Sequence, residues 1–320
     1  MARVCVTGGL GFIGSHLCAA LAGRGWEVVC VDRLSAEHGP GSGPEAAARL
    51  TCLGVRVVRA DVACDELDGA FETVDAIVHL AALPGVRSGH GFAELWAENV
   101  LTTERLIAAA AEGGQRFLLA SSSSVYGDAA WLPSPERTPP SPLGAYAVTK
   151  LAAEQACQRA RRRFGADVVI ARLFTVFGPG QRPDMAFSRW IEGIASGRPI
   201  LWCAARQARR EFTYVADAVA GLAAALERGR SGEIYNIAGC GSTPLRDALW
   251  LLERMLGRRA IIRRRPAFPA EAIATAACGA KAAHELGYRP AFTLAPGLER
   301  QLAAVLAGRG TSRAIAEALV

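Results

Sequence analysis

The 320-residue sequence predicts an α/β fold in which helices cover both faces of a doubly wound parallel sheet. Short apolar segments of strand length alternate with longer segments of helical periodicity through the first half of the chain. Hydrophobic residues make up 51% of the chain, which is enough to form a substantial core. Strands that are separated by helices pair in parallel, because each crossover helix returns the chain to the same edge of the sheet.

Six strands are expected in chain order, over Arg3–Thr7, Glu27–Asp32, Val55–Arg59, Ala76–Leu80, Arg116–Ala120 and Asp167–Leu173. A first helix is indicated by apolar residues that recur on one helical face, namely Ile13, Leu17 and Leu21. Further helices are expected over Phe92–Ala111 and Tyr146–Phe164. Residues 37–50 are rich in Gly, Pro and Ala and predict a surface loop after the second strand.

The pattern loosens after residue 173, where prolines separate shorter elements. A helix is expected over 217–228, and a strand over 233–237 that returns to the main sheet. The sequence therefore predicts a nucleotide-binding domain over 1–172. A smaller and partly interleaved substrate domain is expected over 173–320, with parts near 213–240 rejoining the first domain.

A glycine-rich turn connects the first strand to the first helix. It contains the spacing G-x-G-x-x-G at Gly9, Gly11 and Gly14, and a second spacing that begins at Gly8. Glycines allow the tight turn and the close approach of a diphosphate, and the helix N-terminus supplies N–H donors. A dinucleotide site with this Rossmann geometry is predicted, with contacts from Gly8, Gly11, Phe12, Ile13 and Gly14.

Residues at the ends of the next strands complete the predicted cofactor site. Asp32 ends the second strand, where a carboxylate accepts both ribose hydroxyls of NAD and repels the 2′-phosphate of NADP. Asp61 and Val62 follow the third strand, where the adenine is expected. Small residues at Leu80–Ala82 follow the fourth strand and let the cofactor pass close to the backbone.

Tyr146 and Lys150 lie four residues apart on a predicted helix, so their side chains project from the same face. The chain has two lysines, Lys150 and Lys281, against 34 arginines, so a lysine at this position is unusual. An ammonium group is a compact charge that can lower the pKa of a neighbouring phenol. The pair predicts a proton-transfer centre, with an ordinary exposed helix pair as the alternative.

Composition excludes several other classes of protein. The net charge is +6, but the arginine runs lack interleaved aromatic residues and lie in separate segments, so nucleic acid binding is not expected. No apolar run reaches membrane-spanning length, and no signal-peptide pattern is present, so a cytoplasmic protein is expected. The nine cysteines lack paired spacing, which predicts reduced thiols and no metal site.

These motifs together resemble the extended short-chain dehydrogenases/reductases that act on nucleotide sugars. The resemblance covers nearly the whole chain and is carried by the glycine turn, Asp32, Asp61-Val62, His79–Ala82, Asn99, Ser121–Gly127, Tyr146-x-x-x-Lys150, Arg172–Met185, Arg210–Asp217 and Leu286–Tyr288. It implies NAD as cofactor, adds Asn99 to the cofactor contacts, and implies a homodimer formed through the helices over Phe92–Ala111 and Tyr146–Phe164.

The serine run after the fifth strand indicates which reaction is expected. In this family's 4,6-dehydratases an Asp and a Glu occupy the positions of Ser123 and Ser124, and the decarboxylases place a Glu at Ser124. Hydroxyl groups cannot replace carboxylates as acid–base groups near neutral pH. The chain therefore resembles the epimerases, and Ser122, Ser123 and Ser124 join Tyr146 and Lys150 as expected catalytic residues.

Four residues are expected to bind the substrate. The stretch from Phe174 to Met185 resembles that of UDP-glucuronate 4-epimerases, where the hydroxyl of Thr175 and the charge of Arg182 suit a sugar carboxylate. The resemblance also implies that Arg87 lies near the substrate and that Arg210 binds the diphosphate. A second diphosphate arginine of the family is replaced by Phe268, and the sequence does not decide whether Arg265 takes its place.

The resemblance implies NAD-dependent epimerisation at C4 of a UDP-sugar, with UDP-glucuronate and UDP-galacturonate as the expected pair. The same chemistry on UDP-glucose or its N-acetyl form is one alternative. A decarboxylase or dehydratase of the same family is another. A non-catalytic NAD-sensing or scaffold protein is the alternative from a different class, and the Tyr146–Lys150 pair argues against it.

Overall fold

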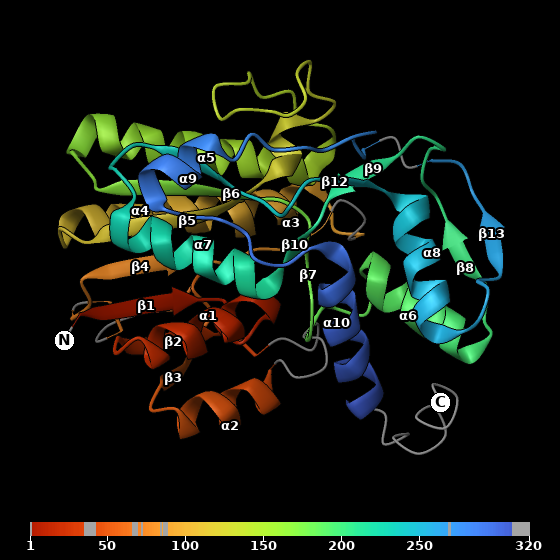
Figure 1. Cartoon of the computed structure of the whole chain (residues 1–320). Helices are drawn as coiled ribbons and strands as arrows, with labels where there is room; N and C mark the ends of the chain where they lie inside the picture. The colour runs from red at the N-terminus through yellow and green to blue at the C-terminus, as the bar shows by residue number, and fades with distance from the viewer. Residues whose placement is uncertain are drawn as a thin grey trace.

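The computed structural model describes residues 2–34, 43–65, 70–71, 73–83, 85, 89–267 and 270–308. Its centre is a seven-stranded parallel sheet with the strand order β11-β6-β5-β4-β1-β2-β3 (Figure 1). The strands are β1 (Arg3–Thr7), β2 (Glu27–Asp32), β3 (Arg56–Arg59), β4 (Ala76–His79), β5 (Arg116–Ser122), β6 (Val168–Leu173) and β11 (Ile234–Ile237). The six predicted strands are confirmed, and the predicted return of 233–237 to the main sheet is confirmed by its pairing with β6.

Helices cover both faces of this sheet, as the strand–helix alternation predicts. One face packs against α1 (Phe12–Gly23) and α7 (Val215–Arg228), and the other against α4 (Thr102–Glu112) and α5 (Gly144–Phe164) (Figure 1). Neighbouring strand residues point to opposite faces, so Val4 and Val6 join the first core while Cys5 joins the second. The sheet is therefore buried on both sides, which is typical of parallel sheets.

Two expectations for the helices need revision. The helix expected over 92–111 is a continuous path of α3 (Phe92–Trp96), a π-helical turn (Ala97–Leu101) and α4. The loop expected over 37–50 is wrong from residue 44 onward, because α2 (Pro44–Cys52) begins there, whereas 37–42 lie outside the described residues. Proline suits the first helical position, and two apolar side chains four residues apart are buried, Ala46 and Leu50.

The smaller C-terminal unit lies beyond the carboxyl ends of the sheet strands (Figure 1). It contains α6 (Ala186–Ser196), α8 (Leu245–Leu256), α10 (Leu294–Gly308) and the pairs β8 (Ile200–Trp202) with β13 (Ile262–Arg264), β9 (Arg209–Glu211) with β12 (Ser242–Pro244), and β7 (Val176–Phe177) with β10 (Thr213–Tyr214). Helix α9 (Ala280–Leu286) lies between β13 and α10 in the chain but packs against α7 and β11 of the sheet unit. Several of these segments alternate with α7 and β11, which belong to the main sheet unit. The two units are thus interleaved along the chain.

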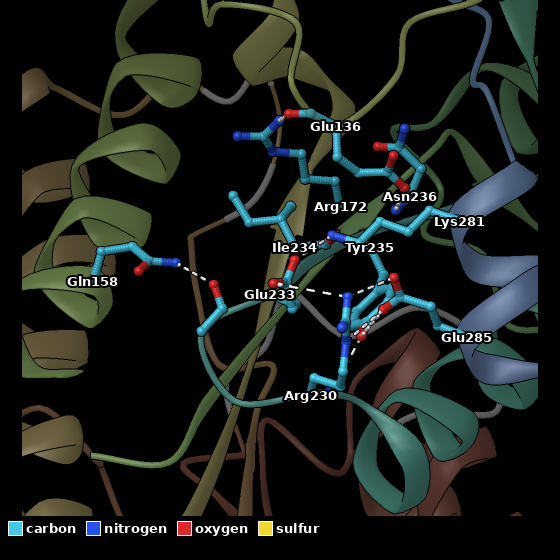
Figure 2. A network of polar contacts seen from close by, with 11 residues as sticks. Glu136, Gln158, Arg172, Arg230, Glu233, Ile234, Tyr235, Asn236, Lys281 and Glu285 are labelled. Carbon is cyan, nitrogen blue, oxygen red and sulfur yellow. Dashed lines mark hydrogen bonds and ion pairs between the residues drawn. The ribbon is translucent and has the colours of Figure 1, made fainter. Parts of the chain in front are cut away.

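Polar contacts attach the edge strand β11 to its surroundings (Figure 2). Lys281 of α9 donates to the carboxylate of Glu233 at 2.6 Å and to the carbonyl of Ile234 at 2.7 Å. The carboxylate of Glu285 accepts from the Tyr235 hydroxyl at 2.7 Å and from Arg230. Lys281 therefore has a structural role at the sheet edge, and Lys150 is the lysine for which a role in catalysis is considered.

No helix in the described ranges combines the length and the apolarity that a bilayer crossing requires. In the same ranges, no three His, Cys, Asp or Glu side chains gather closely enough to hold a metal ion.

Candidate active site

A cavity of about 550 Å³ lies where the carboxyl ends of the sheet strands meet the smaller unit. This is the edge at which open α/β sheets bind ligands. The cavity brings together most of the residues that the sequence predicts for the site: Gly8, Gly11, Phe12, Ile13, Gly14, Asp32, Asp61, Val62, Leu80, Ala81, Ala82, Ser122, Ser123, Ser124, Tyr146, Lys150, Thr175, Arg182 and Arg210.

Among the predicted residues that the structure describes, Asn99 is not part of this lining. Asn99 lies in the π-helical turn behind the wall, where its side chain accepts from the N–H of Leu83 at 2.8 Å and donates to the Thr149 hydroxyl at 3.1 Å. It holds the loop after β4 against α5, and its contact with a cofactor stays a prediction. Arg87 lies outside the described residues.

The glycine turn packs so closely against neighbouring backbone that two of its positions leave no room for a side chain. Gly8 has φ = +68°, and a Cβ there would come within 2.7 Å of the Ala81 backbone nitrogen. A Cβ at Gly14 would overlap the carbonyl oxygen of Gly8. Helix α1 begins after Gly11 with no side-chain cap, so its first N–H groups are not satisfied by a capping side chain. This cradle fits an anionic group.

Acidic residues next to the glycine turn fit the remainder of NAD. The Asp32 carboxylate is 6% exposed and accepts from the N–H of Leu10 at 3.0 Å and of Leu34 at 2.8 Å. Arg33 points to carboxylates of the protein, 3.6 Å from Asp61 and 3.2 Å from Glu98. A cation held in this way is less available for a 2′-phosphate, so the donor set suits NAD better than NADP.

Tyr146 and Lys150 extend from α5 into the cavity, as the spacing predicts. Burial raises the pKa of the Tyr146 phenol, whereas a hydrogen bond with Ser122 and the charge of Arg182 lower it. In the protein alone burial outweighs these two contributions, and the lowering of this pKa by Lys150 stays a prediction. Lys150 is 5% exposed, and burial lowers the pKa of its ammonium group to about 8.

The serine run gives the cavity a row of hydroxyl groups. Ser122 accepts from the N–H of Ser124 at 3.1 Å, which fixes the turn that follows β5. The hydroxyl oxygen of Ser124 is buried and has no hydrogen-bond partner within the described part of the chain. Because an unpaired buried hydroxyl is costly, this group is expected to bond to whatever enters the cavity.

Two predicted substrate residues, Arg182 and Arg210, form ion pairs with acidic residues of the protein. Arg182 donates to both carboxylate oxygens of Asp184, at 2.9 and 2.8 Å. Arg210 lies 3.5 Å from the carboxylate of Glu271, which also lines the cavity. Arg265 is exposed on the smaller unit and is not among the lining residues.

Asp184 and Glu271 were not identified from the sequence. Asp184 lies two residues from Arg182, so their ion pair could have been predicted from the sequence. Glu271 was less detectable, because 60 residues separate it from Arg210 and only the fold brings them together.

Comparisons with known proteins agree with this geometry. Residues 4–238 match the model of the NAD dependent epimerase/dehydratase family. An "Uncharacterized UDP-glucose epimerase" of Bacillus subtilis is 38% identical over 94% of this chain and 97% of its own. "UDP-glucuronate 4-epimerase 3" of Arabidopsis thaliana is 31% identical over 93% of this chain and 75% of its own.

The crystal structure of a UDP-glucuronic acid 4-epimerase from Bacillus cereus, in complex with UDP-glucuronic acid and NAD, is also similar. It superposes with a TM-score of 0.88 at 34% identity, over 95% of this chain and 98% of that one. The family match spans most of the sheet unit, and the glycine turn, Asp32 and the Tyr146–Lys150 pair lie within it. The chain belongs to the NAD dependent epimerase/dehydratase family.

Proposed function

We propose that this protein interconverts UDP-glucuronate and UDP-galacturonate by transient oxidation at C4. The observation that carries the proposal is the composition of one cavity. Tyr146 and Lys150 lie there beside the hydroxyls of Ser122 and Ser124, and next to Thr175 and Arg182. No carboxylate stands at positions 123 and 124, so the chemistry that expels water or promotes decarboxylation lacks its acid–base group.

When bound, NAD would supply the hydride acceptor. Tyr146 takes the proton of the C4 hydroxyl as C4 loses a hydride and becomes a ketone. Lys150 provides a nearby positive charge that favours the phenolate, in addition to the contributions of Ser122 and Arg182. The 4-keto sugar then turns over within the cavity, and the hydride and the proton return on the opposite face of C4.

If the sugar is an acid, the hydroxyls of Thr175 and Ser124 and the charge of Arg182 would also bind its carboxylate. Oxidation of glucuronate at C4 produces a β-keto acid, which loses CO₂ when its carboxylate bond aligns with the ketone π system. Contacts from Thr175, Arg182 and the unpaired Ser124 hydroxyl would hold the carboxylate out of that alignment. The carboxylate would also replace or join Asp184 on the guanidinium of Arg182.

That same ion pair supports a second candidate, the 4-epimerisation of a neutral UDP-sugar such as UDP-glucose. Two guanidinium nitrogens of Arg182 already bond to the Asp184 carboxylate, so the charge is matched and a neutral sugar needs no exchange of partners. Incubation with UDP-glucuronate, UDP-glucose and UDP-N-acetylglucosamine, followed by NMR of the products, separates the two. Preferred conversion of UDP-glucuronate supports the acid sugar, and conversion of the neutral sugars alone would contradict it.

Thr175→Ala tests the carboxylate assignment. The variant is expected to raise KM for UDP-glucuronate by about tenfold, as for the loss of one hydrogen bond to a charged group, or to release CO₂ during turnover. Coupled detection of CO₂ beside the NMR assay measures both. Ser188→Ala, which removes a hydroxyl bonded to the Gln181 carbonyl, is the matched control. Wild-type kinetics without CO₂ in the Thr175 variant would count against the assignment.

We also propose a homodimer formed through α4 and α5. Leu101, the last residue of the π-helical turn before α4, is 51% exposed, and Val148 on α5 is 36% exposed. Both helices also bury apolar residues on their inner faces. Apolar side chains on the outer faces of two adjacent helices suit a helix-to-helix contact with a second copy. Sedimentation at assay concentration should give the mass of two chains, and Leu101→Glu should yield monomers. A wild-type monomer would contradict the proposal.

A further inference from the structure

A buried ion pair lies directly behind the catalytic groups. The Arg172 guanidinium donates to both carboxylate oxygens of Glu154, at 2.9 and 2.7 Å, and the two side chains are only 3% and 4% exposed. The Ser121 hydroxyl donates to the same carboxylate at 2.5 Å. Arg172 also donates to the Glu136 carbonyl at 3.2 Å (Figure 2), and its guanidinium stacks 4.7 Å from the ring of Tyr126.

The three members of this Ser121–Glu154–Arg172 cluster come from the three elements that carry the reaction. Ser121 precedes the serine run at the end of β5. Glu154 follows Lys150 by one helical turn on α5, on the face that also carries Tyr146. Arg172 lies in β6, three residues before Thr175. A displacement of the cluster would therefore move groups from all three elements relative to one another.

Glu154 is also the charged neighbour of Lys150. On α5, the carboxylate of Glu154 raises the pKa of the Lys150 ammonium group, and an ionised Cys157 thiol would do the same. Burial raises the pKa of Cys157, so its thiol stays neutral. From β4, His79 faces Lys150, and burial and the lysine charge lower the pKa of His79 to about 3, so it is neutral as well. Within the described residues, Glu154 thus supplies the negative charge that opposes the desolvation of Lys150.

A buried ion pair does not in itself stabilise a fold more than an apolar pair of the same volume, so its presence calls for another reason. We propose that Glu154, held by Arg172 and Ser121, is a positioning residue that keeps Lys150 charged and aligned with Tyr146 and the serine run. The inference rests on the proposed function, because it assigns to Glu154 a role in the same proton transfer.

The test is the pH dependence of kcat in Glu154→Gln and in the double variant Glu154→Gln/Arg172→Met, which leaves no unpaired charge in the cluster. Without the carboxylate, Lys150 loses its proton at lower pH, so the alkaline limb of kcat is expected to move down by about one pH unit. kcat at pH 7.5 should fall about threefold, because the protonated fraction of Lys150 drops from about three quarters to about one quarter when its pKa moves from about 8 to about 7. KM should change less than about twofold, because the substrate contacts remain.

Asp167→Asn is the matched control. Asp167 pairs with Arg116 at 2.9 Å and joins the same two strands at their amino ends, far from the cavity. This variant should lose stability and keep the wild-type pH profile. If the Glu154 variants fold and their alkaline limb stays in place, the inference is overturned.

Ser121→Ala covers the case in which the Glu154 variants do not fold. It removes one donor from the carboxylate and uncovers no charge, and it is expected to lower kcat several-fold. A wild-type kcat in that variant would overturn the inference as well. A wild-type protein that turns over none of the UDP-sugars contradicts the proposed function instead, so the two failures are distinguishable.

Discussion

Tyr146→Phe is expected to lower kcat by at least about 10³-fold, since it removes the acid–base oxygen and leaves the ring in place. The phenol lines the cavity beside Ser122, and nothing else in the described lining combines a titratable hydroxyl with this position. NAD should remain bound, because the glycine turn and Asp32 are untouched. The measurements are epimer formation by NMR and the absorbance of bound nicotinamide.

Tyr235→Phe is the control for this experiment. Its hydroxyl also takes part in hydrogen bonds, 2.7 Å from the Glu285 carboxylate and 3.1 Å from the N–H of Arg230, but it lies at the edge strand and not in the cavity. The variant should lose about 1 kcal/mol of stability and keep its activity. Substantial turnover by Tyr146→Phe would show that another group carries the proton.

Lys150→Met is expected to lower kcat by about 10²-fold and to change the shape of its pH profile. In the wild type, the ammonium form is present below pH 8 and is lost above it, because burial lowers the pKa of Lys150 to about 8. The wild-type kcat should therefore fall as the pH rises through this value. The variant has no group that titrates there, so its residual rate should lack this limb.

The remaining lysine gives the control. Lys281→Met removes the ion pair with Glu233 at the edge of the sheet, so it should lower the melting temperature and leave the alkaline limb unchanged. An alkaline limb that persists in Lys150→Met would assign this titration to a different group.

The fold was predictable to the extent that its signals are local in the sequence. Strand–helix alternation predicted the sheet, and an apolar segment at 233–237 predicted the return of β11. The composition of 37–50 was misleading, because alanine, glycine and proline are common both in loops and in a short helix that proline begins. The π-helical turn at Ala97–Leu101 was not predicted, and its residue Asn99 bonds to Leu83 and Thr149, which are distant in the sequence.

The sequence by itself determined the glycine turn and the Tyr146–Lys150 pair, because backbone geometry over a few adjacent residues brings these groups together wherever the segment folds. Only the tertiary structure decided which distant charges meet: Arg210 with Glu271, and Arg172 with Glu154. The tertiary structure also decided that burial raises the pKa of the Tyr146 phenol more than Ser122 and Arg182 lower it. Burial and long-range charge pairing depend on segments far apart in the chain, and no local pattern encodes their distances.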